Sequence, residues 1–244
     1  MMNFEIRQIV ITSVLLAAFF ALGVGFVAYT EQKTAEQIEL NRQAVLLGQI
    51  MEVLAGEDYD NNPAEDAFIL SDPEALNLGE PVIEPAPAGL LPSLPSDEEQ
   101  ERAMTAGQLG FRARRDGETI AVAIPVVTHR GYSGDIRLLV GVEASGEVKG
   151  VRVLEQNETP GLGDKIKAEK TDWILGFTGR GLGNPPPEGW AVKKDGGVFD
   201  QFTGATISPR AVVEAVESAL EYVEQHRSAL FGTPPDVHTE EDTS

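Results

Sequence analysis

A run of uncharged, mostly apolar residues near the N-terminus is the strongest constraint on what this chain can form. Residues 9–29 (IVITSVLLAAFFALGVGFVAY) contain no Asp, Glu, Lys or Arg. As an α-helix rising about 1.5 Å per residue, the run is about 30 Å long, which matches the hydrocarbon core of a bilayer. A cleaved signal peptide has a shorter apolar region followed by a small-x-small site, and Ala28-Tyr29-Thr30 does not supply that site. We therefore expect an uncleaved transmembrane anchor rather than a signal peptide or a buried core helix.

The charges on either side of this run predict its orientation. Arg7 and the terminal amine precede it, whereas Lys33 follows it among glutamates. Under the positive-inside rule, residues 1–8 lie in the cytoplasm and the chain after residue 30 lies outside it. The chain is then a single-pass membrane protein whose soluble domain lies outside the cytoplasm.

Composition excludes several kinds of chemistry. The 244 residues include no cysteine, which excludes thiolate-held iron–sulfur clusters, c-type haem attachment, cysteine zinc sites, disulfides and thiol nucleophiles. The three histidines (His129, His226 and His238) have no Glu or second His at metal-ligand spacing, so we expect no metal site and no catalytic triad. The net charge of −20 argues against a nucleic-acid partner, because neutralising phosphates requires clustered Lys and Arg.

The acidity is concentrated in two stretches. Segment 57–102 has 13 acidic residues and one basic residue, the tail 233–244 carries −4, and the remaining residues together carry only −4. Seven prolines in the first stretch are typical of an extended linker, although its apolar group 67–70 is able to pack onto a domain. We divide the chain into a cytoplasmic N-terminus (1–8), the anchor (9–29), a membrane-proximal helix (30–56), an acidic proline-rich segment (57–104), a folded domain (105–232) and an acidic tail (233–244).

The pattern after residue 105 predicts an α+β domain. Apolar and β-branched residues predict strands over 119–127, 138–144 and 148–154, the last two joined through Ser145-Gly146 as a β-hairpin. Residues 190–193 and 197–199 flank Asp195-Gly196 as a second predicted hairpin. Because hairpins occur between helices without repeated βαβ units, the fold class is α+β.

A final helix follows the second hairpin. Ser208 is its expected N-cap, Pro209 its first helical residue, and Gly232 lies beyond its end. Its apolar face consists of Val212, Val213, Val216, Leu220 and Val223.

Residues 199–209 (FDQFTGATISP) place two threonines and two small residues directly before this helix. Backbone N–H groups at a helix start, together with the helix dipole, favour a phosphate there. Gly204 and Ala205 leave room for a bulky group to approach the backbone. From the residues alone, an ordinary capped loop stays open as the alternative. The glycines at 179–183 lack the preceding strand and the spacing of a dinucleotide-binding motif.

Asp200 followed by Thr-Gly-Ala-Thr at 203–206 resembles the flavinylation motif of FMN-binding domains. Such domains occur in the G subunit of the Rnf electron-transport complex and in the C subunit of the sodium-translocating NADH:quinone reductase. Further stretches resemble the Rnf G subunit in order and spacing: GYSGDI at 131–136, ETPGLG at 158–163, KTDW at 170–173 and KKDGG at 193–197. The resemblance runs from the anchor to about residue 230, and the chain departs from the family at 80–101 and in its tail.

The resemblance implies one FMN bound through a phosphodiester to the hydroxyl of Thr206. The implied cofactor-binding residues are Thr206, Thr203, Gly204, Ala205, Asp200, Glu158, Thr159, Leu162, Gly163, Lys194 and Tyr132. Within this set, Glu158 and Thr159 could hydrogen-bond the ring or the ribityl chain, and Lys194 could meet the phosphate or the reduced ring. Tyr132 and Trp173 are candidates to shield the ring. A plain turn at 158–163, an exposed lysine and core aromatics stay open as alternatives.

The resemblance also implies a redox subunit of an ion-translocating oxidoreductase, without catalytic residues of its own. Its FMN would relay single electrons in a complex that couples electron transfer between ferredoxin and NAD to ion translocation. The implied partners are the membrane, the other membrane subunits and, during maturation, a flavin transferase that uses FAD. Two alternatives stay open: the quinone-reductase C subunit, and a non-redox membrane-anchored adaptor whose acidic stretch binds a partner.

Overall fold

The structure is a computed structural model that describes residues 2–55, 59–80 and 107–232. The chain divides into two compact units, Met1–Leu46 and Leu47–Ser244. The part of the predicted acidic segment that follows residue 80 and the whole tail 233–244 lie outside the described residues.

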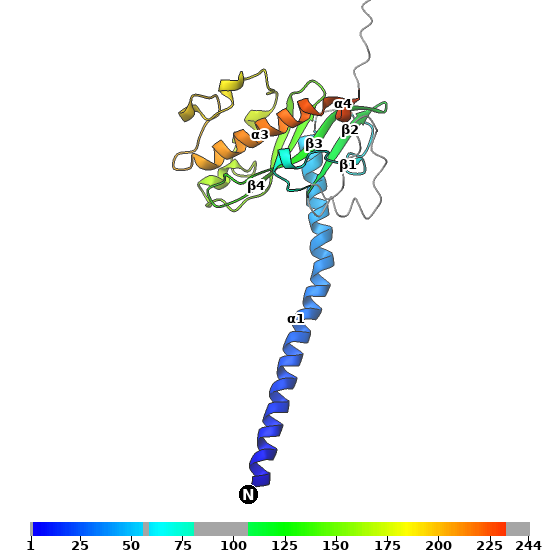
Figure 1. Ribbon diagram of the computed structural model, residues 1–244, viewed down its shortest axis with the longest axis vertical. Helices are drawn as coiled ribbons and strands as arrows, with labels where there is room; N and C mark the ends of the chain where they lie inside the picture. The colour runs from blue at the N-terminus through cyan, green and yellow to red at the C-terminus, as the bar shows by residue number, and fades with distance from the viewer. Residues whose placement is uncertain (1, 56–58, 81–106, 233–244) are drawn as a thin grey trace, which may run out of the picture. The chain divides into compact units, whose positions relative to one another are not determined.

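Helix α1 (Met2–Val53) provides the whole first unit and its last residues belong to the second (Figure 1). It contains the membrane-proximal helix that the sequence predicts over 30–56 as far as Val53. Large apolar side chains between Ile9 and Tyr29 are exposed along it, among them Phe19 and Leu22 at 73% and 75%. Across the part of the chain that the structure describes, no helix reaches the combined length and hydropathy of a membrane span.

A five-stranded antiparallel sheet forms the centre of the second unit, with its strands side by side in chain order. The strands are β1 (Ala67–Ile69), β2 (Leu109–Arg115), β3 (Glu118–Thr128), β4 (Ile136–Glu143) and β5 (Val148–Glu155). The prediction of a strand over 119–127 and of a hairpin through Ser145-Gly146 is confirmed, with Gly146 at φ +91° in the turn. These strands together with helix α3 (Ile207–Gln225) confirm the α+β class.

One face of the sheet packs against α3 (Ile207–Gln225), which crosses it in Figure 1. All five residues of the predicted apolar face of this helix are buried, and they share one core with Leu138, Val140 and Val142 of β4. A short helix, α4 (Arg227–Phe231), follows and ends at Gly232. The amphipathic pattern of the final helix therefore predicted its packing.

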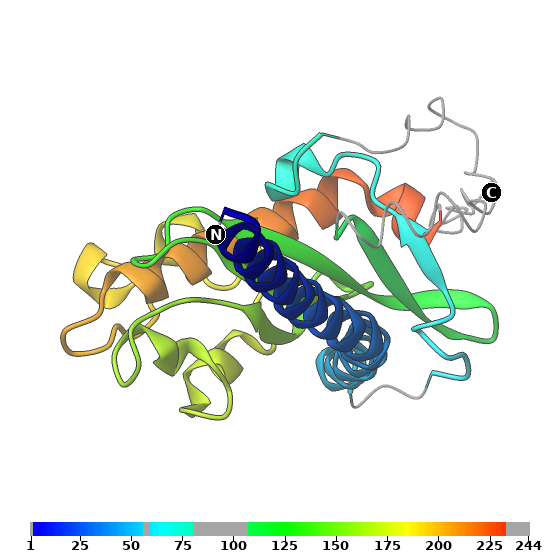
Figure 2. The same ribbon diagram turned by 90° about the horizontal axis from the view of Figure 1, so that it is seen from below.

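The opposite face of β4 and β5 receives the last turn of α1. Gly141 and Gly150 are cross-strand partners, and a Cβ atom at Gly150 would lie 3.0 Å from the Cα of Val53. A Cβ at Gly141 would collide with the carbonyl oxygen of Val53. Val53 is fully buried, and Glu52 forms a 2.6 Å ion pair with Arg152. Figure 2 views the sheet from below. The two glycines let helix backbone and sheet backbone approach directly.

Residues 59–80 are part of the second unit. Strand β1 pairs with β2, and a 3-10 turn, η1 (Glu74–Leu76), brings Leu76 into the core. Buried Phe68 and Leu70 confirm that the group 67–70 packs onto the domain. The first part of the acidic stretch is therefore folded, because its few apolar residues bury against the sheet.

The chain between β5 and α3 is irregular. It contains four 3-10 turns: η2 (Gly163–Ile166), η3 (Asp172–Phe177), η4 (Pro187–Gly189) and η5 (Lys193–Asp195). The predicted second hairpin at 190–199 is wrong. Val192 and Phe199 form a single parallel bridge instead, and η5 occupies the expected turn. Phe199 and Trp190 pack into an aromatic cluster with Phe177, Trp173 and Phe202, and this packing replaces strand pairing.

The start of α3 also differs from the prediction. Thr206 is the N-cap and Ile207 the first helical residue, so Ser208 and Pro209 lie within the first turn. Ser208 is buried, and its hydroxyl donates to the carboxylate of Glu158 rather than to its own helix. A long-range partner thus overrides the local capping preference of serine.

Candidate functional site

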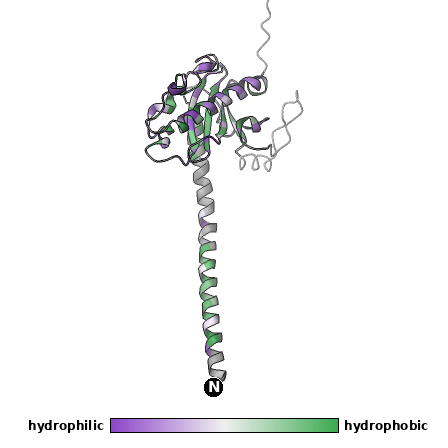
Figure 3. Cartoon of the chain, turned by 60° about the vertical axis from the view of Figure 1, so that its left-hand side comes forward, coloured by the Kyte–Doolittle hydropathy of each residue, from purple (hydrophilic) through white to green (hydrophobic). Residues whose placement is uncertain are grey.

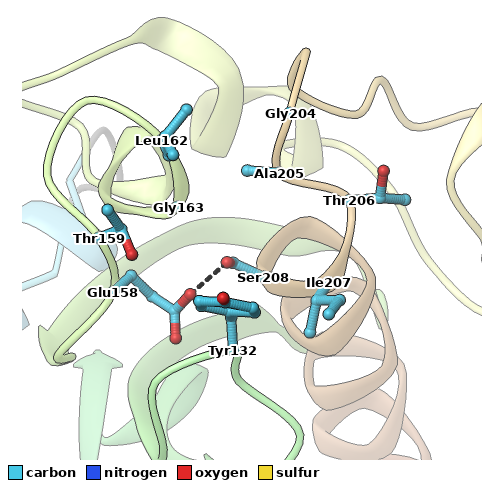
Figure 4. A pocket seen from close by; sticks show the side chains of 10 residues that line it. All are labelled: Tyr132, Glu158, Thr159, Leu162, Gly163, Gly204, Ala205, Thr206, Ile207 and Ser208. Atoms are coloured by element: carbon cyan, nitrogen blue, oxygen red, sulfur yellow. Dashed lines mark hydrogen bonds between the residues drawn. The ribbon is translucent and has the colours of Figure 1, made fainter.

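A pocket opens at the N-terminal end of α3 (Figure 4). Its volume is about 310 Å³, within the usual range of small-molecule sites. It is lined by Tyr132, Glu158, Thr159, Leu162, Gly163, Gly204, Ala205, Thr206, Ile207 and Ser208. These residues come from the β3–β4 loop, the loop after β5, and the junction of the irregular segment with α3.

The turn before α3 forms one wall of the pocket. The N–H of Ala205 donates to the carbonyl of Phe202 at 3.0 Å, and Gly204 has a φ of +83°, which favours glycine. Thr206 follows as N-cap, and its side chain makes no capping hydrogen bond. The Thr206 hydroxyl therefore does not cap the backbone N–H groups of α3.

The loop at 158–163 forms the opposite wall. The carbonyl of Thr159 accepts the N–H of Leu162 at 3.1 Å and that of Asp164 at 3.5 Å, and Gly161 between them has a φ of +76°. The loop is a tight turn that leads directly into η2. Leu162 stays 41% exposed, and in Figure 4 it lies across the pocket from Thr206.

Glu158 forms the floor of the pocket and is only 4% exposed. Its Oε1 accepts the backbone N–H of Ser133 at 3.0 Å, and its Oε2 accepts the hydroxyl of Ser208. Ser208 is a site residue that the sequence interpretation missed, since a serine beside a helix start predicts a cap. The contact joins residues fifty positions apart, so no local pattern indicates it.

Eight of the predicted residues line this one pocket and three do not. Thr203 is exposed in the turn beside it. Asp200 forms a 2.6 Å ion pair with Lys193, and its carbonyl accepts the indole N–H of Trp173 at 2.7 Å. Lys194 is exposed on η5, where its backbone N–H donates to Gln201. Trp173 belongs to the aromatic cluster and does not line the pocket.

The helix start at this pocket is suited to an anion. The first N–H groups of a helix have no carbonyl partner within it, and the dipole adds positive potential there. Beside this helix start, Arg210 forms a bidentate pair with Asp195 at 2.7 and 3.0 Å. Its hydrogen bonds to Asp195 keep the pKa of that carboxyl below its ordinary value. Among the residues that the structure describes, no cluster of His, Asp or Glu is suited to hold a metal.

Comparisons with known proteins agree with this geometry. A family model described as an FMN-binding domain matches residues 131–221, a range that contains every residue of the pocket. A solved structure, the C subunit of a Na(+)-translocating NADH-quinone reductase from Parabacteroides distasonis, covers 80% of this chain and 96% of that chain. Its TM-score is 0.47 at 19% identity, a likeness that carries no argument about function.

Relatives of similar length have a common description. The G subunit of the ion-translocating oxidoreductase complex of Vibrio cholerae (strain O395) is 40% identical over 220 residues, which cover 90% of this chain and 92% of that protein. The protein of the same description from Shewanella oneidensis is 38% identical, covering 93% and 95%. That from Pseudomonas aeruginosa (strain PAO1) is 40% identical, covering 94% and 96%.

Proposed function

The chain belongs to the family of G subunits of ion-translocating oxidoreductase complexes, and we propose that it is the flavin-bearing electron carrier of such a complex. The matched FMN-binding domain and the pocket at the start of α3 support this role. The observation that carries it is the position of Thr206, which caps α3 beside the pocket with a hydroxyl that makes no capping bond.

In this proposal, Thr206 carries one FMN through a phosphodiester to its hydroxyl. The residues at the pocket fit such a group: the helix start favours the phosphate, and Gly204 adds no side chain to the wall beside it. Attachment through a phosphodiester needs only a hydroxyl. It does not need a cysteine, and this chain has none. A flavin transferase that uses FAD would load the cofactor during maturation.

The chemistry that bound FMN supplies is the uptake and release of single electrons. The chain's own residues bind and orient it: the loop at 158–163 faces the turn at 203–206 across the pocket. Electron transfer between ferredoxin and NAD, coupled to ion translocation, would be a property of the assembled complex. Its other membrane subunits are then the physiological partners of this chain.

We further propose that residues 9–29 hold the protein in the bacterial inner membrane, with the second unit in the periplasm. Supporting this, the run lacks charge, and its large apolar side chains are solvent-exposed along α1. Figure 3 shows the apolar residues along this part of the helix. Alkaline carbonate extraction of cell membranes tests the anchor: full-length protein should stay in the pellet, and release into the supernatant would reject it.

The attachment site is tested by in-gel flavin fluorescence after denaturation. The full-length chain, expressed in a host with a flavin transferase, should give a fluorescent band, and Thr206→Ala should abolish it. Thr203→Ala is the matched control, since Thr203 lies in the same exposed turn and does not line the pocket.

The outcomes separate the alternatives. Fluorescence that persists in Thr206→Ala would reject that residue as the attachment site, and loss only in Thr203→Ala would move the site there. A wild-type chain without covalent flavin would favour the non-redox adaptor instead.

A further inference from the structure

The buried carboxylate of Glu158 is the most unusual polar group at the pocket. It is held from three separate segments: its own loop, the β3–β4 loop through the N–H of Ser133, and the first turn of α3 through the hydroxyl of Ser208. The backbone N–H of Glu158 is itself fixed by the side chain of Gln156 at 2.5 Å. The group therefore has one position, which the fold imposes.

Two glycines enclose this carboxylate. A Cβ at Gly131 would lie 2.8 Å from its Oε1, and a Cβ at Gly163 would lie 2.6 Å from its Oε2. These distances are shorter than carbon–oxygen contacts allow, so any larger residue would displace the carboxylate or its partners. The close packing keeps the side chain at 4% exposure, while the residue still lines the pocket.

The hydrogen bonds indicate a charged group. Each carboxylate oxygen accepts from a donor, one N–H and one O–H, which is the pattern of an ionised carboxylate. Ser208 is in the first turn of α3, where the helix dipole stabilises negative charge. A charge shielded from water acts strongly on a neighbouring group, because the local dielectric is low.

We propose that Glu158 is a fixed negative charge that lowers the reduction potential of a flavin in this pocket, and that Ser208 is the residue that positions it. The proposal rests on the proposed function. If a flavin bound here accepted an electron without a proton, that electron would add one negative charge to the pocket. Repulsion from a fixed carboxylate makes that addition less favourable, which moves the midpoint potential to a more negative value.

The test is a spectroelectrochemical titration of the full-length chain purified with its flavin. Glu158→Gln keeps the size and an acceptor oxygen but removes the charge, so its midpoint potential should shift to a more positive value. Glu155→Gln is the matched control: Glu155 ends β5, its side chain is 75% exposed and 3.9 Å from Arg137, and its removal should cause a much smaller shift.

Ser208 is tested by a pair of substitutions. Ser208→Ala removes the donor that holds the carboxylate, so its potential should shift in the same direction as in Glu158→Gln but by less. Ser208→Thr keeps a hydroxyl and should stay closer to the wild-type potential. A purely packing role for Ser208 predicts the reverse order, because Ala fits the buried site better than Thr.

Three results would overturn the inference. The first is an unchanged potential in a flavin-loaded Glu158→Gln protein. The second, if that variant does not retain flavin, is an unchanged potential in Ser208→Ala. The third is loss of flavin from both variants, which would show that the pair binds the cofactor rather than tunes it. A wild-type chain without flavin would instead reject the proposed function.

Discussion

The sheet and the irregular segment 156–206 are held together by different means. In the sheet, backbone ladders and alternating side chains define each position, and α3 covers one face. In the segment, 3-10 turns and three isolated bridges replace ladders, and the aromatic cluster around Phe177 fills the interior. The site loops lie at the two ends of the segment, where it leaves β5 and enters α3.

This arrangement combines freedom of backbone shape with precision of position. Most of the site residues belong to loops, which can take the shape that a ligand requires. Their ends are nevertheless fixed by a rigid strand and a rigid helix, and Glu158 joins the two ends through Ser208. The strand and the helix thus fix the positions of the site residues, and the irregular backbone between them allows a ligand to approach closely.

The largest expected effect comes from Phe177→Ala, which removes the centre of the aromatic cluster. Phe177 is fully buried, with ring centroids 4.6 Å from Phe199 and 5.4 Å from Trp173. We expect the free energy of unfolding to fall by about 3–5 kcal/mol, from lost burial and the cavity left behind. Urea denaturation measures it, with Leu175→Ala, a 44% exposed residue of the same turn, as control. A cost of under about 1 kcal/mol would show that the cluster does not hold the segment.

The next-largest effect tests the sheet, where the last turn of α1 packs against β4 and β5. Gly141→Ala places a methyl group against the backbone of Val53, so the last turn of α1 must move away from the sheet. Overpacking of this kind costs about 1–3 kcal/mol, measured as a lower urea midpoint. Gly176→Ala is the control, because no atom lies within 4 Å of its added Cβ. Equal midpoints for the two variants would contradict close docking of helix on sheet.

A smaller effect tests whether residues 59–80 belong to the regular part. The buried hydroxyl of Tyr222 accepts the backbone N–H of Ser71 at 3.2 Å, and burial raises the pKa of Tyr222. Tyr222→Phe leaves that N–H without its acceptor, so we expect a loss of about 1 kcal/mol. Tyr132→Phe, at an exposed tyrosine, should leave stability unchanged in the same denaturation series. An equal loss of stability in Tyr132→Phe would contradict a specific contribution of the Tyr222–Ser71 hydrogen bond.

The smallest effect concerns a single charge on α3. Burial, followed by repulsion from Glu221 and Glu214, raises the pKa of Glu217. Because the pKa of this carboxyl is higher in the folded state than in the unfolded state, its ionisation destabilises the fold. The destabilisation is absent below the unfolded-state pKa and complete above the folded-state pKa. Glu217→Gln should therefore raise Tm slightly at pH 7.

The pH series completes that test. The advantage of Glu217→Gln should disappear as the pH falls below about 4, near the ordinary value for glutamate. Thermal melts at several pH values, followed by circular dichroism, measure the difference. A Tm advantage that does not change with pH would show that packing or helix propensity, rather than charge, accounts for it.

Much of the regular fold could be predicted from local pattern. The apolar, β-branched residues over 119–127 and the Ser145-Gly146 turn identified strands correctly, and the apolar face of α3 identified its buried side. The second hairpin failed for a physical reason. Trp190 and Phe199 have strand-like neighbours, but their rings bury against Phe177 instead, and packing of large aromatics outweighs weak strand propensity.

The candidate site was predicted in part. The motifs 158–163 and 203–206 were chosen as separate stretches of sequence, and the fold brings them to one pocket. Lys194 and Asp200 also belong to stretches that resemble the family, but both lie outside the pocket. Asp200 forms an ion pair with Lys193, and Lys194 is exposed. Spacing along the chain does not distinguish a lining residue from a neighbour that supports the loop.

The sequence by itself determined the α+β class, the apolar side of the last helix and the family, because periodicity and contiguous motifs are local properties. Only the tertiary structure decided where α3 begins, that Ser208 binds Glu158 rather than capping its helix, and which motif residues share a pocket. These depend on contacts between residues far apart in the chain, and their energies are comparable to the local preferences that they override.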